Sequence, residues 1–184
     1  MLMKIRTLFT IIKELIHRST TPPDVYAREL GVIIGEDNFL PDKGCWSSEP
    51  YLITVGSHCQ ITSGVKIFTH GGGHVVRDKV PTFDTFGRVT IGDWVYIGNN
   101  SLIMPGVTIG NNVLVAAGSV VTKSVPSGYV VGGNPARIIC TIEDYYKKNS
   151  TFDIGTKGMS NDKKKALLLS LGDNKLIKKR YMSR

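Results

Sequence analysis

The sequence has few cysteines, few aromatic residues and no long apolar run. Its three cysteines are an odd number without a Cys-x-x-Cys spacing, which excludes a disulfide framework and provides no zinc motif. No segment reaches the ~20 apolar residues of a membrane-spanning helix. In the N-terminal segment Lys13 and Glu14 cut the apolar run short, and no small-residue cleavage site follows. An amphipathic helix is therefore expected there instead of a signal peptide, in a cytoplasmic protein.

Positive charge is concentrated at the two ends of the chain. The formal net charge is +8, of which residues 1–20 contribute +3 and residues 143–184 contribute +6, so the middle carries −1. A nucleic-acid-binding protein should carry its basic groups on an ordered reading surface, so no nucleic-acid partner is expected. Two interpretations of the basic tail stay open. It packs its leucines on the protein with its charges in water, or it makes weak peripheral contact with an anionic inner-membrane surface.

Glycine, by contrast, is abundant, and the chain contains an internal repeat. The 20 dispersed glycines indicate many turns. Aliphatic residues recur at every sixth position, at Ile91, Ile97, Ile103, Ile109, Val115 and Val121. A period of six cannot keep side chains on one face of a helix with 3.6 residues per turn. It fits one short strand plus a turn, with three such sides closing a coil of about eighteen residues in a stacked repeat protein.

The repeat also divides the chain. An earlier run follows the same period, and a looser set is expected to form a first, less regular coil. These residues are Val55, Ile61 and Ile67 for the earlier run, and Ile34, Leu40, Trp46 and Leu52 for the looser set. Residues 71–87 break the pattern and are predicted to form a loop that projects from the stack. The expected organisation is an N-terminal amphipathic helix and linker at 1–29, a repeat domain at 30–142 and a basic helical tail at 143–184.

The segment IGDWVYIGNNSLIMPGVTIGNNVLVAAGSVVTKSVPSGYVVGGNPARII resembles the hexapeptide-repeat acyltransferases, close to the galactoside, maltose and nodulation O-acetyltransferases. The segment VKIFTHGGG is similar to members that acetylate surface polysaccharides. This resemblance covers residues 30–142 and implies an all-β fold, a left-handed parallel β-helix with an N-terminal helix and a C-terminal helical tail. It also implies acetyl-CoA as cosubstrate, no metal, and a homotrimer with active sites between subunits. The implied acceptor is a sugar hydroxyl of a surface-polysaccharide or lipopolysaccharide precursor.

Acetyl transfer to a hydroxyl needs a base for the hydroxyl proton. His70 ends the last regular strand before the loop and matches the catalytic histidine of the family, so it is the first candidate. His74 is the second, and two solvent-exposed loop histidines without a role are the plain alternative. Relatives in the polysaccharide subset often carry an acidic residue after this histidine. Gly71 stands there in this chain, so the sequence does not identify the group that orients the imidazole.

The resemblance also implies a coenzyme A site. The matching positions are Asn99, Ala117, Gly118, Thr122, Lys123 and Arg137. Exposed backbone at the small residues suits the pantetheine amides, and the two cations suit phosphates. Lys123 alternatively is a solvated turn residue. Cys140 stands where some relatives have a further basic residue, which weakens the expected phosphate clamp. Trp94 and Tyr96 face outward, either to line the acceptor pocket or to pack against a neighbouring subunit.

Three alternative functions stay open at this point. One is an N-acetyltransferase that acts on a nucleotide-linked amino sugar. A metalloenzyme similar to the γ-carbonic anhydrases has the same repeat, but it needs three histidines around a metal. His58, His70 and His74 supply that count without that family's spacing. A non-catalytic β-helix scaffold is the third alternative, and the GGNPAR ending argues against it.

Overall fold

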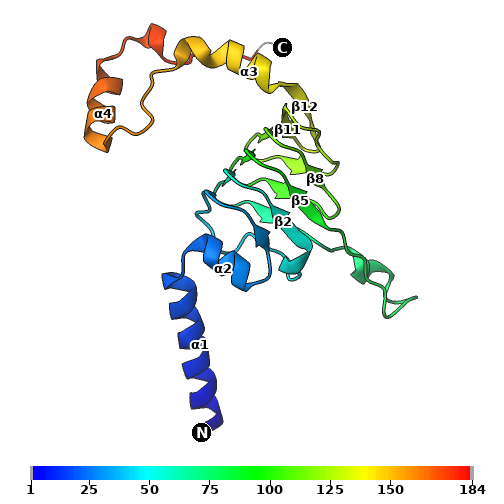
Figure 1. Cartoon of the computed structure of the whole chain (residues 1–184). Helices are drawn as coiled ribbons and strands as arrows, with labels where there is room; N and C mark the ends of the chain where they lie inside the picture. Colours follow the sequence, from blue (N-terminus) through cyan, green and yellow to red (C-terminus); the bar gives the residue numbers. More distant parts are fainter. Residues whose placement is uncertain (1, 183–184) are drawn as a thin grey trace. The chain divides into compact units, whose positions relative to one another are not determined.

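The computed structural model describes residues 2–182, and side chains are described from residue 11 onward. The chain forms two compact units, residues 1–142 and 143–184. The first unit begins with helices α1 (Leu2–Thr20) and α2 (Pro23–Glu29) and continues as a stack of short strands (Figure 1). The strands are β1 Ile33–Ile34, β2 Ile53–Val55, β3 Gln60–Ile61, β4 Lys66–Ile67, β5 Val89–Ile91, β6 Tyr96–Ile97, β7 Leu102–Ile103, β8 Thr108–Ile109, β9 Leu114–Val115, β10 Val120–Val121, β11 Tyr129–Gly133 and β12 Ala136–Thr141.

The strands form three sheets, which the chain visits in turn. The first sheet has the order β1-β2-β5-β8, the second β12-β11-β9-β6-β3, and the third β10-β7-β4. All neighbours are parallel except the β11–β12 hairpin. Thr90 pairs with Thr108 and Tyr96 with Leu114, each pair 18 residues apart. This register confirms the coil of eighteen residues, and Figure 1 shows β2, β5 and β8 stacked in consecutive coils.

The core runs along the axis of the stack. The aliphatic residues of the repeat, from Ile91 to Val121, are buried, as are Val55, Ile61 and Ile67. The residue two positions before each of them is buried as well, as Val95 and Val113 illustrate. Each fully buried Val or Ile side chain stabilises the fold by about 1.5–3 kcal/mol. The repeat therefore arises because each strand must place two side chains inside a narrow prism.

Glycine is required where successive coils touch at a corner. A Cβ atom on Gly98 would lie 2.5 Å from the backbone nitrogen of Ala117 in the next coil. Backbone of the next coil cannot move aside without breaking the strand pairing on either side of that corner. The glycine at this second position of the repeat is therefore a packing requirement.

The N-terminal part of the chain differs from the sequence-based expectation in two places. Leu52 was predicted to belong to the buried set, but it lies in the 3₁₀ helix η1 (Pro50–Leu52), and Ile53 and Val55 are the buried residues of β2. The shift arises because η1 replaces part of a regular side of the coil. The segment before residue 30 is also more than a linker, since α2 forms there and buries Ala27.

The predicted loop leaves the stack after β4 and returns before β5 (Figure 1). Thr69 and Gly87 close its base, because the Gly87 N–H donates to the Thr69 carbonyl at 2.7 Å and His70 forms an antiparallel bridge with Phe86. Thr54 pairs with Thr90, 36 residues later, so the loop adds the equivalent of one coil. Within it, residues Gly73–Val76 form the 3₁₀ helix η2.

The second unit is helical. Helix α3 (Ile142–Asn149) follows β12, and after the 3₁₀ turn η3 (Ser150–Phe152) the chain forms α4 (Asn161–Ser170) and a three-residue 3₁₀ turn, η4 (Asp173–Lys175). A basic helical tail was expected over residues 143–184, but after Gly172 the described residues form only that 3₁₀ turn. Among the residues that the structure describes, no helix is long and apolar enough to span a bilayer.

Candidate active site

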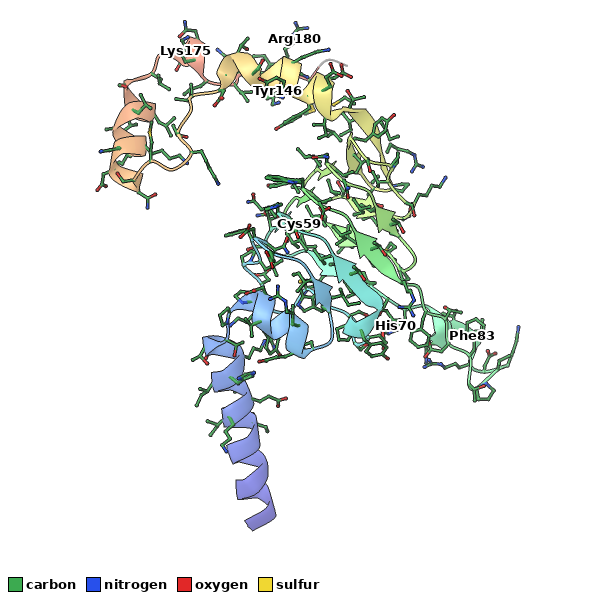
Figure 2. The ribbon with its side chains drawn as sticks, viewed as in Figure 1. Cys59, His70, Phe83, Tyr146, Lys175 and Arg180 are labelled. Carbon is green, nitrogen blue, oxygen red and sulfur yellow. The ribbon has the colours of Figure 1, made fainter. Side chains whose placement is uncertain are left out.

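His70 and Glu49 form a hydrogen-bonded couple at the base of the loop. Figure 2 labels His70 there. His70 follows β4, and Glu49 immediately precedes η1 in the coil before it. The Glu49 Oε2 atom lies 2.6 Å from His70 Nδ1 and accepts a hydrogen bond from the Thr69 hydroxyl at 2.7 Å. The Glu49 side chain is 17% exposed and that of His70 is 37% exposed. The carboxylate is thus mostly enclosed, while the imidazole remains open to an approaching substrate.

The protonation of this couple follows from its hydrogen bonds. The hydrogen bond from Thr69 is the main cause that holds the pKa of the Glu49 carboxyl below its usual value of 4.5, and the hydrogen bond from His70 adds to it. An ionised carboxylate can only accept, so the His70 Nδ1 atom carries the proton. In the neutral imidazole the other nitrogen, Nε2, is then unprotonated. His70 is arranged to accept a proton at Nε2.

Glu49 is a candidate site residue that the sequence analysis did not identify. It supplies the orienting carboxylate that was sought after His70, where Gly71 stands instead. It lies 21 residues earlier, in the irregular first coil, where the six-residue register could not be read. Its position in the coil directly preceding His70 was the only available signal.

His74, the second candidate base, lies in η2 and is exposed. No carboxylate orients its imidazole among the side chains of residues 11–182. The loop thus carries His74 away from Glu49, the carboxylate that orients His70.

The third sheet places part of the expected coenzyme A site on the same edge as His70. Its strands are parallel, so the residues that follow β4 and β10 lie along one edge. His70 follows β4, and Thr122 and Lys123 follow β10. Two strand spacings, roughly 10 Å, separate the paired ends of β4 and β10. A ligand that extends along this edge can contact both.

Lys123 and Arg137 line one pocket of about 400 Å³. Its other lining residues include Val121, Val125 and Val131, so the pocket combines an apolar wall with two cations. Arg137 lies in β12, where its Nη1 donates to the carbonyl of Ala136. This donor set suits a ligand with an apolar arm and anionic phosphates.

Asn99, Ala117 and Gly118 meet at the corner between the second and third sheets. The Gly118 N–H donates to the Asn99 carbonyl at 2.8 Å, and all three residues are exposed. Gly118 has a φ of 69°, which favours glycine. Five of the six expected coenzyme A residues therefore lie along the two edges of the third sheet, and the sixth, Arg137, reaches its pocket from the hairpin.

Trp94 and Tyr96 are not brought to the His70 edge within one chain. Tyr96 faces outward on the second sheet, and Trp94 lies at the corner between the first and second sheets. His58 lies at that same corner, where its ring stacks on Trp94. The three histidines needed by a carbonic-anhydrase-like site are thus not assembled. Within the described part of the chain, no three His, Cys, Asp or Glu side chains are grouped to hold a metal.

Cys45 and Cys59 are not arranged to act as nucleophiles. Cys45 and Cys59 are buried free thiols. Burial raises the pKa of the Cys45 thiol to about 12 and raises the pKa of Cys59 as well. Because the thiolate is the nucleophilic form, these two residues are core groups.

The coil register, the three parallel sheets and the oriented histidine together define a hexapeptide-repeat β-helix enzyme. The bacterial transferase hexapeptide (six repeats) model matches residues 87–123. The chain is 51% identical to Protein CapG of Staphylococcus aureus over 157 residues, which cover 84% of this chain and 89% of that protein. It is 32% identical to the galactoside O-acetyltransferase of Escherichia coli over 134 residues, covering 70% of this chain and 64% of that protein.

Solved structures agree with this assignment. A hexapeptide-repeat-containing acetyltransferase from Vibrio cholerae aligns with a TM-score of 0.51 and 25% identity, covering 76% of this chain and 91% of that one. A galactoside acetyltransferase in complex with coenzyme A has the same fold, with a TM-score of 0.50 and 24% identity over 72% of this chain and 78% of that one. The chain belongs to the hexapeptide-repeat acetyltransferase family. It is an acetyl-CoA-dependent acetyltransferase.

Proposed function

We propose that the protein transfers the acetyl group of acetyl-CoA to a hydroxyl of a sugar in a surface-polysaccharide or lipopolysaccharide precursor. The observation that supports this most strongly is the Glu49–His70 couple, with its open Nε2 atom. The resemblance of the VKIFTHGGG segment to polysaccharide-modifying members favours the sugar class of acceptor.

The reaction proceeds by direct attack. His70 Nε2 accepts the proton of the sugar hydroxyl while the hydroxyl oxygen forms a bond to the thioester carbonyl carbon. The carbon–sulfur bond then breaks, the imidazolium returns its proton to the sulfur, and coenzyme A leaves as the thiol. Glu49 stays ionised throughout and stabilises the imidazolium through Nδ1, so it acts as a positioning residue.

The cosubstrate is assigned to the third sheet and the hairpin. Lys123 and Arg137 bind the phosphates. The exposed backbone at Ala117 and Gly118 forms hydrogen bonds with the amides of the pantetheine arm. This placement leaves the thioester end free to extend along the sheet edge toward His70.

We further propose a left-handed coil and a homotrimer with active sites between subunits, as the family resemblance implies. Exposed apolar side chains on the outward faces support such an assembly, among them Tyr96 and, on the loop, Val75, Val80 and Phe86. We also propose that the basic tail makes weak contact with an anionic membrane surface. Exposed Leu169 follows the basic run Lys163–Lys165 within α4, although basic and apolar residues are not separated onto two faces.

The test is a thiol-release assay with acetyl-CoA across a panel of sugar acceptors, followed by NMR of the product. Thiol release with an ester on a sugar hydroxyl, labile to mild base, is the expected result. A base-stable amide on an amino sugar would replace the proposed acceptor with an amine. Coenzyme A binding without thiol release for any acceptor would contradict the proposed sugar acceptor class.

A further inference from the structure

One corner of the stack carries an aromatic pair in an unusual backbone conformation. Successive coils make the same turn between the first and second sheets, and in each turn one residue has a positive φ. These residues are Asp37 (54°), His58 (58°), Trp94 (57°), Asn112 (53°) and Gly128 (83°). From His58 onward, their backbone N–H groups donate to a carbonyl of the coil before, as Trp94 does to Ser57 at 3.0 Å and Asn112 does to Asp93 at 2.9 Å. The turn is therefore held by backbone bonds that do not depend on the side chain.

Glycine, asparagine, aspartate and histidine adopt this conformation more readily than other residues, whereas a bulky side chain such as that of Trp94 is strained there. The later coils have Asn112 and Gly128, which shows what the turn itself favours. Burial does not offset the strain at Trp94, because this residue is 62% exposed. Strained residues of this kind persist where the side chain serves a ligand or partner.

The two rings stack on one another, and the exposed Trp94 side chain has polar groups beside it. The ring centroids are 4.4 Å apart and the ring planes are inclined by 26°. The Asp37 carboxylate lies 3.6 Å from His58 Nδ1, and Asn112 occupies the next coil beyond Trp94. An apolar face flanked by a carboxylate and an amide can contact the C–H face of a sugar ring while hydrogen-bonding its hydroxyls.

We infer that the His58–Trp94 pair, with Asp37 and Asn112 beside it, is a sugar-binding subsite for a part of the acceptor glycan remote from the reacting hydroxyl. This inference rests on the proposed sugar acceptor. The pair lies on a different corner from His70, so it engages a ring other than the one that is acetylated.

The extent and polarity of the surface favour a sugar over a second protein copy. A stable protein interface buries roughly 800 Å² on each partner, and charged residues are depleted from its centre. At the corner itself the aromatic side chains are His58 and Trp94, while exposed Phe39 and Tyr96 lie on the adjoining second sheet. Exposed polar residues surround the corner pair, namely Asp37, Asp93, Asn111 and Asn112.

The test compares Trp94→Asn with Trp94→Phe in the full-length protein. Asparagine suits the turn, as Asn112 shows, so the first variant should fold with unchanged or higher thermal stability. Binding of two probes, maltotriose and the trisaccharide of N-acetylglucosamine, is measured by ligand-detected NMR without acetyl-CoA. At least one probe should bind, and Trp94→Asn should weaken it about tenfold, while Trp94→Phe retains most of the affinity.

Three results would overturn the inference. The first is that neither trisaccharide binds the wild type. The second is that both trisaccharides bind Trp94→Asn with the same affinity as they bind the wild type. The third is that Trp94→Asn lowers the molecular mass in light scattering and so reveals a subunit contact. Acetyl transfer is not used as the readout, so these outcomes are independent of the assay that tests the proposed function.

Discussion

Replacing Glu49 with glutamine should separate positioning from proton transfer. A positioned general base contributes roughly 10²–10⁴-fold to turnover, which sets the upper limit for any effect through His70. In Glu49→Gln the side chain is nearly isosteric but uncharged. It either accepts from Nδ1 without stabilising the imidazolium, or donates to Nδ1 and so leaves the proton on Nε2. We expect kcat to fall roughly 10- to 100-fold, less than for His70→Ala, with the KM for acetyl-CoA little changed.

Thr69→Val is the matched control for this experiment. It removes the other hydrogen bond to the same carboxylate oxygen but leaves the charge of Glu49 at neutral pH. Its kcat should fall less than that of Glu49→Gln, and both variants should elute and melt as folded proteins. The reasoning is refuted if Glu49→Gln keeps wild-type kcat, or if it raises the KM for acetyl-CoA at unchanged kcat.

Three further predictions concern the ligand, the fold and pH. Lys123→Ala and Arg137→Ala should each weaken coenzyme A about tenfold in calorimetry and weaken analogues lacking the 3′-phosphate or the pyrophosphate less; equal losses would mean that these residues only support the fold. Gly98→Ala should destabilise the protein by about 1–3 kcal/mol in denaturant unfolding, because its Cβ meets the Ala117 backbone, and an unchanged midpoint would contradict that packing. Because folding lowers the pKa of Glu49, its stabilisation is present above the ordinary value of 4.5 and is lost as pH falls through the folded-state pKa. The melting-temperature gap between wild type and Glu49→Gln should therefore narrow below about pH 4.5, and a constant gap would show that the carboxylate charge is not involved.

The regular coils could be predicted because buried side chains recur at a fixed spacing of six residues, as Ile91 and Ile97 show. The first coil could not, since η1 replaces a regular side and shifts the buried residue from Leu52 to Ile53. The sequence indicated His70 through its place at the end of a strand. Glu49 was inaccessible to the same reasoning, because contact between residues 21 positions apart depends on the path of that irregular coil.

The aromatic corner illustrates a second limit. The sequence marked Trp94 as outward-facing, and the structure agrees. The sequence did not show that His58 stacks on Trp94, or that both residues have left-handed backbone conformations. These features depend on how the coils align on either side of the loop of residues 71–87. The period does not show how many residues the loop adds to the register.

The central claim is that His70 is the base of an acetyl transfer, and a paired comparison of His70→Ala with His74→Ala tests it most directly. Steady-state thiol release should fall roughly 10²–10⁴-fold for His70→Ala, with coenzyme A affinity retained in calorimetry. His74→Ala should stay close to the wild type in turnover. A large loss for His74→Ala together with near-normal turnover for His70→Ala would contradict the account.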